Sequence, residues 1–519
     1  MPASSASSPM STPAMRFLLG AVFLGAVDLS VISTLLLPIV RDLEQNTADL
    51  DRYAWVVIGY LLAYVAAIPI FGRLIDGAGL RVTLAIGLTV FLTGTALTVT
   101  AGSLESLIAG RIVQGAGGGA ILPIAMAYVS STLPPGARLG GYGLVAAVDT
   151  LGWVLGPILG ALVVSLDGQL DHSWRLAFAP NILLLGGLVV VLRRGDRPSV
   201  PIGLDQADGG GWLGILLLTG GLSLANLALA ASGQLGSGGD ATGLRALGGT
   251  ENPLTAYVPL ILVGAAILLL VTWLVERRAL RPVFPSEMRT SPEFLTGIAV
   301  GVAVGAASAV VIATVPVFAA LRSTSQSPSA LAAILLTPHT LATAVAALLS
   351  DRLDRLVGLR RTILTGLIAA TAGSLAAAVA LDRTTSTVAV VPGLVLMGVG
   401  LGLSLGPILA LGLRGIPDRL AGSGASALLG ARLLGATVGI SAVTAFGTWR
   451  IEGLLTDLEP VPRIDGESTA DFFVRQAAYI DGTVVPRAVQ AISEIYLLGA
   501  VVCLLGAITL MRRSRPSPP

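Results

Sequence analysis

The chain has 519 residues, of which 54% are hydrophobic and only 12% are charged, about half the charged share of an ordinary soluble domain. This composition excludes a water-soluble enzyme. The formal charge of +2 gives no indication of nucleic-acid binding. The single cysteine, Cys503, excludes an intrachain disulfide framework and a cysteine-based metal site.

Fourteen apolar stretches, each long enough to cross a bilayer, occupy most of the chain. They predict an all-α membrane protein, because a β-barrel would show short segments of alternating hydrophobicity instead. The predicted spans are 16–40, 54–75, 82–101, 106–130, 139–165, 174–193, 211–232, 255–275, 293–320, 329–350, 361–381, 388–413, 421–449 and 488–511.

An even number of spans places both termini on one side of the membrane. The segments on that side hold twice as many arginines as the segments on the other side, which predicts cytoplasmic termini. We therefore expect a multi-pass protein of the bacterial inner membrane. The chain has no lysine, and arginine stays protonated in proteins. A proton carrier must then be a carboxylate or one of two histidines, His172 and His339, which lie too far apart in sequence and topology to suggest a metal site.

The spans divide the chain into a disordered tail, two six-helix halves joined by a linker with two extra transmembrane helices, and a short C-terminal tail. These parts cover 1–15, 16–194, 195–290, 291–511 and 512–519. Two outer segments are long. The Gly-rich segment 233–254 predicts a flexible connection. The amphipathic segment 450–487 predicts either two helical extensions that form a hairpin outside the membrane or a solvated loop.

The two halves contain an internal repeat. The loops at 72–81 and 351–360 share the frame x-R-L-x-x-x-x-G-L-R, and the fifth and thirteenth spans align so that Asp149 stands opposite Arg432. Duplicated halves are typical of transporters that rock one half against the other around a site near the bilayer midplane. The repeat therefore predicts a transporter.

The loop after the second span carries a more specific pattern, G-x-L-x-D-R-x-G-R-K. Gly77 and Leu80 stand where that pattern has basic residues. The matching residues are Gly72, Leu74, Asp76, Gly79 and Arg81. This loop resembles the signature of the major facilitator superfamily, and the number of spans is similar to that of its fourteen-span drug:proton antiporters. The glycines would allow a tight turn, and Asp76 could meet a helix N-terminus or an arginine.

Two further elements support this resemblance. The run from Arg111 to Gly115 in the fourth span is similar to the family element R-x-x-Q-G, which implies that Arg111 takes part in proton transfer. The fifth span resembles the antiporter element G-x-x-x-G-P-x-x-G-G, which implies close packing and a kink at a seal between the halves. Its matching residues are Gly152, Gly156, Pro157 and Gly160.

Charged residues inside an apolar helix are costly and normally functional. We expect Asp28 or Asp149 to carry the proton, with Arg111 and Arg432 as electrostatic partners. Glu494 is a further candidate for this charge network, and His339 ranks with it. The alternative is that Asp149 and Arg432 form a conformational lock that does not titrate. The sequence has no Walker-type phosphate loop, so we expect no cofactor and the proton motive force as the energy source.

Few charges along the spans predict a hydrophobic or amphipathic cargo, either drugs or lipids. Arg432, the segment 450–487 and Glu494 are similar to features of mycobacterial triacylglyceride exporters, which implies a lipid exporter that works with a periplasmic lipoprotein. A non-transporting receptor or scaffold with the same fold is a second alternative. We expect a monomer in contact with membrane lipids and not an enzyme, because the G-x-S-x-G pattern around Ser404 lies in an apolar span.

Overall fold

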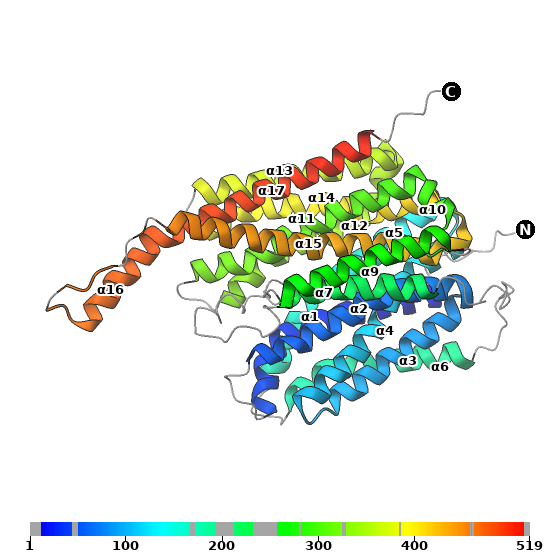
Figure 1. The fold of residues 1–519 in the computed structure, drawn as a ribbon, viewed down its shortest axis with the longest axis horizontal. Helices are drawn as coiled ribbons and strands as arrows, with labels where there is room; N and C mark the ends of the chain where they lie inside the picture. The colour runs from blue at the N-terminus through cyan, green and yellow to red at the C-terminus, as the bar shows by residue number, and fades with distance from the viewer. Residues whose placement is uncertain are drawn as a thin grey trace, which may run out of the picture.

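The computed structural model describes residues 12–43, 50–166, 172–193, 212–231, 257–279, 282–323, 328–383, 386–456, 458, 461–464 and 466–512. Every element in this part of the chain is helical, and the long helices run side by side in two bundles (Figure 1). The predicted all-α membrane fold is confirmed. The tail before residue 12, the Gly-rich connection 233–254 and the tail after residue 512 lie outside the described residues.

The N-terminal bundle holds the first six predicted spans. Proline at the first turn begins α1 and α5, and Ser103 begins α4 with a reciprocal cap to Ser106, which satisfies amide groups that a helix start leaves free. The elements are α1 (Pro13–Asp42), α2 (Leu50–Ala78), α3 (Leu80–Val99), α4 (Leu104–Thr132), α5 (Pro135–Val164), η3 (Ser173–Ile182) and α6 (Leu183–Arg193).

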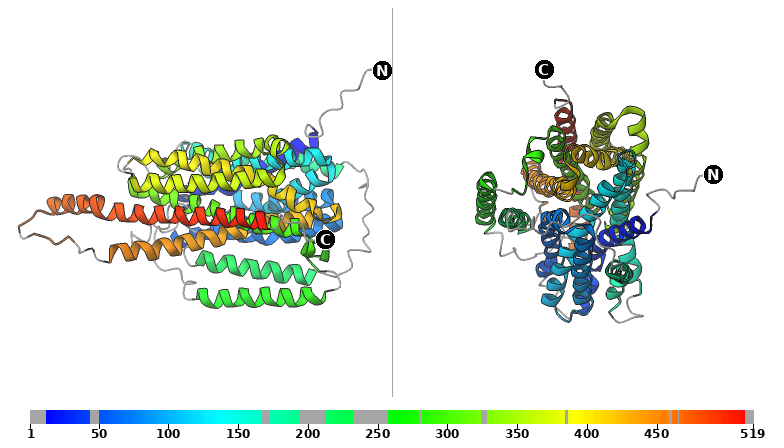
Figure 2. Two further views of the ribbon diagram at one scale, coloured as in Figure 1. Left: turned by 90° about the horizontal axis from the view of Figure 1, so that it is seen from above. Right: turned by 90° about the vertical axis from the view of Figure 1, so that its right-hand side faces the viewer.

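Two helices follow, and they pack against each other at one edge of the molecule (Figure 2). These are α7 (Trp212–Ala231) and α9 (Val258–Arg278). Thirteen helices of the described chain are long and apolar enough to cross a membrane, and α9 is among them. The seventh predicted span corresponds to α7, where the apolar stretch runs over Leu213–Ala225 and is shorter than the others.

The C-terminal bundle holds the last six predicted spans. The G-x-S-x-G pattern lies inside one of them, where Ser404 Oγ donates to the Gly400 carbonyl of its own helix at 3.0 Å. The elements are α10 (Ser286–Thr290), α11 (Pro292–Arg322), α12 (Pro328–Val357), α13 (Leu359–Arg383), η6 (Thr387–Val390), α14 (Val391–Arg414), η7 (Asp418–Leu420), α15 (Ala421–Leu455), α16 (Thr469–Tyr479), η8 (Ile480–Val484) and α17 (Val485–Arg512).

The repeat predicted from the sequence is visible in how helices pair through glycine. A Cβ on Gly152 of α5 would lie 2.6 Å from the Cβ of Ala26 on α1. The aligned glycine of α15, Gly435, faces the backbone of Val302 on α11 in the same way. Each bundle therefore seats its fifth spanning helix on its first through small residues, which let two backbones approach closely.

In the described part of the segment 450–487, two helical extensions run beyond the bundles, as expected for the hairpin; its place on the outer side of the membrane stays a prediction. The end of α15 and the helices α16 and η8 extend beyond the other helices, on the side away from the end of α17 (Figures 1 and 2). At the tip, Arg475 donates to both carboxylate oxygens of Glu467 at 3.0 and 2.7 Å. This guanidinium holds the pKa of Glu467 below its usual range, so the pair breaks only when the pH falls through that lowered value.

The two bundles touch each other at the end opposite the hairpin. Asp76 at the end of α2 accepts hydrogen bonds from Gly422 N and Ser423 N at the start of α15, at 2.7 and 2.9 Å. Arg138 of α5 forms an ion pair with Asp418 at 3.1 Å. These contacts join the N-terminal and C-terminal bundles across one end of the molecule.

Candidate functional site

A buried polar cluster surrounds Asp28 in the middle of α1. Its Oδ2 accepts from Arg111 Nη1 at 2.8 Å, and its Oδ1 accepts from Gln114 Nε2 and Asn181 Nδ2, both at 2.8 Å. Asp28 and Asn181 are at most 3% exposed, and Arg111 and Gln114 are fully buried. Every one of these contacts brings a donor to the carboxylate, which is the environment of a charged acid.

The elements that carry the cluster come from four parts of the N-terminal bundle. Asp28 lies on α1, Arg111 and Gln114 lie one turn apart on α4, and Asn181 lies on η3. Thr95 of α3 accepts from Gln114 Nε2 at 2.9 Å and so fixes the orientation of that amide. The cluster therefore ties α1, α3, α4 and η3 together around a single acid.

Arg111 is held on its other side by an aromatic ring. Its guanidinium carbon lies 4.1 Å from the centroid of Tyr60 on α2, and its Nε and Nη2 atoms are buried without a hydrogen-bond partner. The ring replaces the second anion or the water that a buried guanidinium would otherwise need. Tyr60 stacks in turn on Tyr64, with the two centroids 6.1 Å apart.

We expect the Tyr60 ring, and not its hydroxyl, to stabilise Arg111. The hydroxyl of Tyr60 is buried without a partner, so Tyr60→Phe should leave thermal stability in detergent almost unchanged. Tyr60→Leu removes a desolvated cation–π contact worth about 2 kcal/mol and should lower the unfolding midpoint clearly. Equal midpoints for the Phe and Leu variants would contradict this assignment.

Asp149 and Arg432 come from different bundles. Asp149 lies on α5 and Arg432 on α15, and the Arg432 guanidinium is the charge that acts electrostatically on the Asp149 carboxylate. The two side chains form no ion pair within 4.0 Å. The structure thus pairs Asp28 directly with Arg111, whereas Asp149 and Arg432 act on each other electrostatically without an ion pair.

Glu494 and His339 lie apart from this network. Glu494 receives two hydrogen bonds from Arg450, at 2.6 and 2.8 Å, and this pair joins α15 to α17 at the base of the hairpin. His339 Nδ1 donates to the Leu394 carbonyl at 2.8 Å and so joins α12 to α14. Glu494 therefore pairs with Arg450 of the neighbouring helix extension, and its part in the charge network stays a prediction.

The signature loop is built as the sequence pattern predicts. Gly79 has φ +83°, a left-handed conformation that favours glycine, and α3 begins directly after it, with Arg81 in its first turn. A Cβ on Gly72 would collide with the hydroxyl of Ser426 on α15. Asp76 meets the N-terminus of α15, where backbone amides and the helix dipole favour an anion.

The glycines of the antiporter element pack against α1 of their own bundle. A Cβ on Gly156 would collide with Ser30 Oγ, and one on Gly160 would collide with Thr34 Oγ1; both neighbours belong to α1. Pro157 lies within α5 between these glycines. The predicted close packing is therefore found between α5 and α1, the helix that carries Asp28, and the role of this element in a seal between the halves stays a prediction.

Sequence reasoning missed three members of the cluster as functional residues: Gln114, Thr95 and Asn181. Gln114 lies within the element R-x-x-Q-G of the fourth span, but its side-chain amide does not titrate. The amide of Asn181 does not titrate either. Thr95 gives no signal in the sequence. Amide and hydroxyl groups of this kind position a charged group without changing charge themselves, and only the three-dimensional contacts reveal them.

Comparison with known proteins shows which family and which named proteins this chain is similar to. The family description "Major Facilitator Superfamily" matches residues 18–440. A triacylglyceride transporter of Mycolicibacterium hassiacum is 30% identical over 94% of this chain and 89% of its own length. "Multidrug resistance protein 3" of Bacillus subtilis (strain 168) is 24% identical over 95% of this chain and 93% of its own length.

Solved structures agree on the fold. The human organic anion transporter MFSD10 superposes with a TM-score of 0.60 at 16% identity, over 96% of this chain and 100% of that protein. At this identity the likeness concerns the fold alone. A match that spans most of the chain, together with a duplicated helical bundle and the signature loop around Asp76, makes this protein a member of the Major Facilitator Superfamily.

Proposed function

We propose that this transporter exports hydrophobic or amphipathic compounds across the bacterial inner membrane in exchange for protons, with both termini in the cytoplasm. The observation that carries the proposal is the buried Asp28–Arg111 pair, with its two atoms 2.8 Å apart and both side chains almost fully buried. A charged pair in the core of an apolar bundle is costly to keep. A role in proton coupling accounts for the presence of this costly pair.

The chemistry requires only that a proton compete with an arginine for one carboxylate. While Asp28 is charged, it holds Arg111, Gln114 and Asn181. A proton that binds to Asp28 removes the charge that attracts Arg111, so the contacts that join α1 to α4 and η3 weaken. Movement of α1 would then pass to α5, because Gly156 and its neighbours seat these two helices on each other.

Asp149 and Arg432 supply the second part of the proposal. They belong to different bundles and interact electrostatically, so their separation changes when one bundle rocks against the other. In the conformation described here the bundles are joined at the end opposite the hairpin, through Asp76 and Arg138. We propose that this is the cytoplasmic end. We further propose that the electrostatic interaction between Asp149 and Arg432 changes in strength as that end opens.

The cargo follows from the composition and from the relatives. Only 12% of residues are charged, and the relatives carry names that refer to triacylglycerides and to multidrug resistance. We propose drugs and lipids as the substrate classes, with the protein working as a monomer. No nucleotide or other cofactor enters the proposal.

Transport by the purified chain in proteoliposomes tests the function. A pH gradient, acidic on the side that the hairpin faces, should drive a fluorescent triacylglyceride or a lipophilic cationic dye toward that side, and collapsing the gradient with an ionophore should stop it. Failure to move any member of a lipid and cationic-drug panel would favour a receptor or scaffold that keeps the fold.

A dedicated lipid exporter that works with a periplasmic protein is the alternative favoured by the hairpin. Its α16 helix exposes Phe473 by 59% and Val474 by 71%, outside the main body of the molecule. Apolar side chains in such a position gain from being covered by a partner. The partner of this proposal is a periplasmic lipoprotein that presents an apolar surface to the hairpin.

We expect deletion of 455–485, with a short Gly/Ser connection in its place, to reduce lipid export by cells at least about tenfold if docking is required, while drug resistance persists. Phe473→Ser with Val474→Ser is the matched variant, because it removes the apolar surface and keeps the Arg475–Glu467 pair. If lipid export is unchanged both in cells with the deletion and in cells with the double serine variant, the docking role has no support.

A further inference from the structure

The C-terminal bundle has a cavity at the end opposite the hairpin. It measures about 440 Å³ and lies among the start of α11, the α12–α13 loop and the end of α14. The size is that of a small-molecule site. Neither the charge network nor the contacts between bundles described above use it, and its lining residues are Glu293, Val357–Arg361, Leu411 and Arg414.

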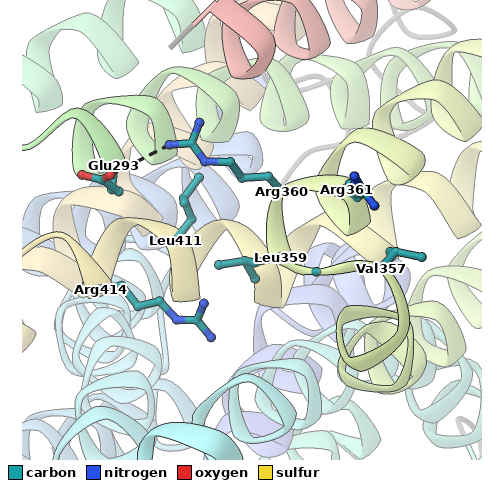
Figure 3. Close-up of a pocket in the computed structure, with 8 residues that line it drawn as sticks. Glu293, Val357, Leu359, Arg360, Arg361, Leu411 and Arg414 are labelled. Atoms are coloured by element: carbon teal, nitrogen blue, oxygen red, sulfur yellow. Dashed lines mark ion pairs between the residues drawn. The ribbon is translucent and has the colours of Figure 1, made fainter. Parts of the chain in front are cut away.

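The lining is strongly basic. Three arginines, Arg360, Arg361 and Arg414, surround the cavity with a single acid, Glu293. Arg360 reaches Glu293 only at 3.9 Å, and its Nη1 is buried without a hydrogen-bond partner. Figure 3 shows Arg360 and Glu293 on one side of the hollow and Arg414 on the other. The arginines outnumber the acids among these lining residues by three to one, so the site carries an excess of positive charge.

The repeat explains why the acids near the cavity balance only part of its positive charge. In the N-terminal bundle the equivalent loop presents Asp76, which binds the start of α15. The position that aligns with Asp76 in the second loop is Arg355, which turns to Asp351 of its own helix at 2.7 Å. The second loop therefore has no carboxylate at this position. Its Asp354 balances part of the charge of Arg414 electrostatically, without an ion pair within 4.0 Å, and Glu293 is the one acid among the residues that line the cavity.

Apolar side chains complete the wall. Leu359 and Leu411 lie between the two arginine groups (Figure 3), and Leu356, beside the cavity residue Val357, is 81% exposed. A wall with both guanidinium and aliphatic groups fits a ligand that is anionic at one end and apolar next to it. A free phosphate would use only the charged half of such a wall.

We propose that this cavity binds the phosphate-bearing headgroup of one anionic phospholipid, drawn from the leaflet on the side opposite the hairpin. Guanidinium groups suit phosphate because they offer two parallel donors. Arg360 and Arg414 would hold the phosphate from opposite sides, and the leucines would contact the glycerol. A lipid in this place would bridge α11, α13 and α14 and so act on the C-terminal bundle without occupying the transport path.

Native mass spectrometry of the purified full-length protein tests the proposal, with phosphatidylglycerol and phosphatidylcholine offered together in equal amounts. The wild-type chain should retain one phosphatidylglycerol in preference to phosphatidylcholine. The double variant Arg360→Gln, Arg414→Gln should lose this preference by about tenfold or more, since an arginine near an anionic lipid contributes about fivefold. Arg355→Gln removes an arginine of the same loop outside the cavity and should behave as wild type.

Equal retention by the wild type and the double variant would overturn the proposal, as would an equal loss in the Arg355→Gln control. Inorganic phosphate, offered alone in excess, distinguishes the source. A phosphate adduct that forms on the wild type and displaces phosphatidylglycerol completely would overturn the lipid assignment. If the double variant does not fold, the single variant Arg414→Gln, at an exposed position, should show about a fivefold loss, and no loss in it would equally overturn the proposal.

Discussion

Asp28→Asn is expected to abolish transport driven by a pH gradient, to within the background of empty liposomes. The asparagine keeps the size of the side chain but cannot bind and release a proton, so one member of the proposed exchange is lost. Exchange of labelled for unlabelled substrate, which needs no proton, should persist. Asp481→Asn, at an exposed position of the hairpin, is the control and should transport as wild type.

The variant carries a structural cost that must be separated from its effect on coupling. Arg111 would be left buried and without its anion, a change that costs about 3–5 kcal/mol in buried pairs. Asp28→Asn combined with Arg111→Gln removes both charges and should recover stability while remaining uncoupled. Asp149→Asn distinguishes the two acids: loss of coupling there as well would mean that both carry the proton. Full gradient-driven transport in Asp28→Asn and in Asp149→Asn would defeat the coupling proposal.

Asp76→Asn is expected to open the end of the molecule opposite the hairpin. The carboxylate accepts from two backbone amides of α15, and hydrogen bonds to a charged group contribute about 1.5–3 kcal/mol each. An amide side chain can keep one such bond but loses the charge that favours the helix N-terminus. The population of the joined conformation should fall about tenfold or more.

Electron–electron distance measurements between spin labels at Thr132 and Arg355 report this change. Both positions are exposed and belong to different bundles. The Asp76→Asn variant should show a longer distance that is rare in the wild type. Asp418→Asn removes an exposed ion pair between the same bundles, which is worth little, and should shift the distribution only slightly. Equal distributions for Asp76→Asn and the wild type would show that this contact does not hold the end closed.

The architecture could be predicted from the sequence because each level of it leaves a linear pattern. Apolar runs of about twenty residues mark the spans, and the aligned glycines Gly152 and Gly435 mark the duplicated packing of α5 and α15. The positive φ of Gly79 follows from a turn that the motif around it requires. Even the hairpin is encoded locally, by the amphipathic stretches of 450–487.

The site could be predicted only in part. Asp28 and Arg111 can be recognised in the sequence because a charged residue stands out in an apolar span. The other two side chains that donate to Asp28, Gln114 and Asn181, are uncharged, so a search for charged residues does not find them. The charge of Glu494 is visible in the sequence in the same way, but its pairing with Arg450 appears only in the structure. The orientation of the glycine element toward α1 depends on helix rotation, which the spacing of glycines alone does not determine.

If substrate leaves as protons enter, the two fluxes run in opposite directions and can be recorded together. Proteoliposomes loaded with a pH-sensitive dye should show proton movement when a transported compound is added, in the direction opposite to the compound, and the signal should vanish in Asp28→Asn while substrate exchange continues. Transport by the wild type with no proton movement, and with no response when the pH gradient is collapsed, would contradict the account.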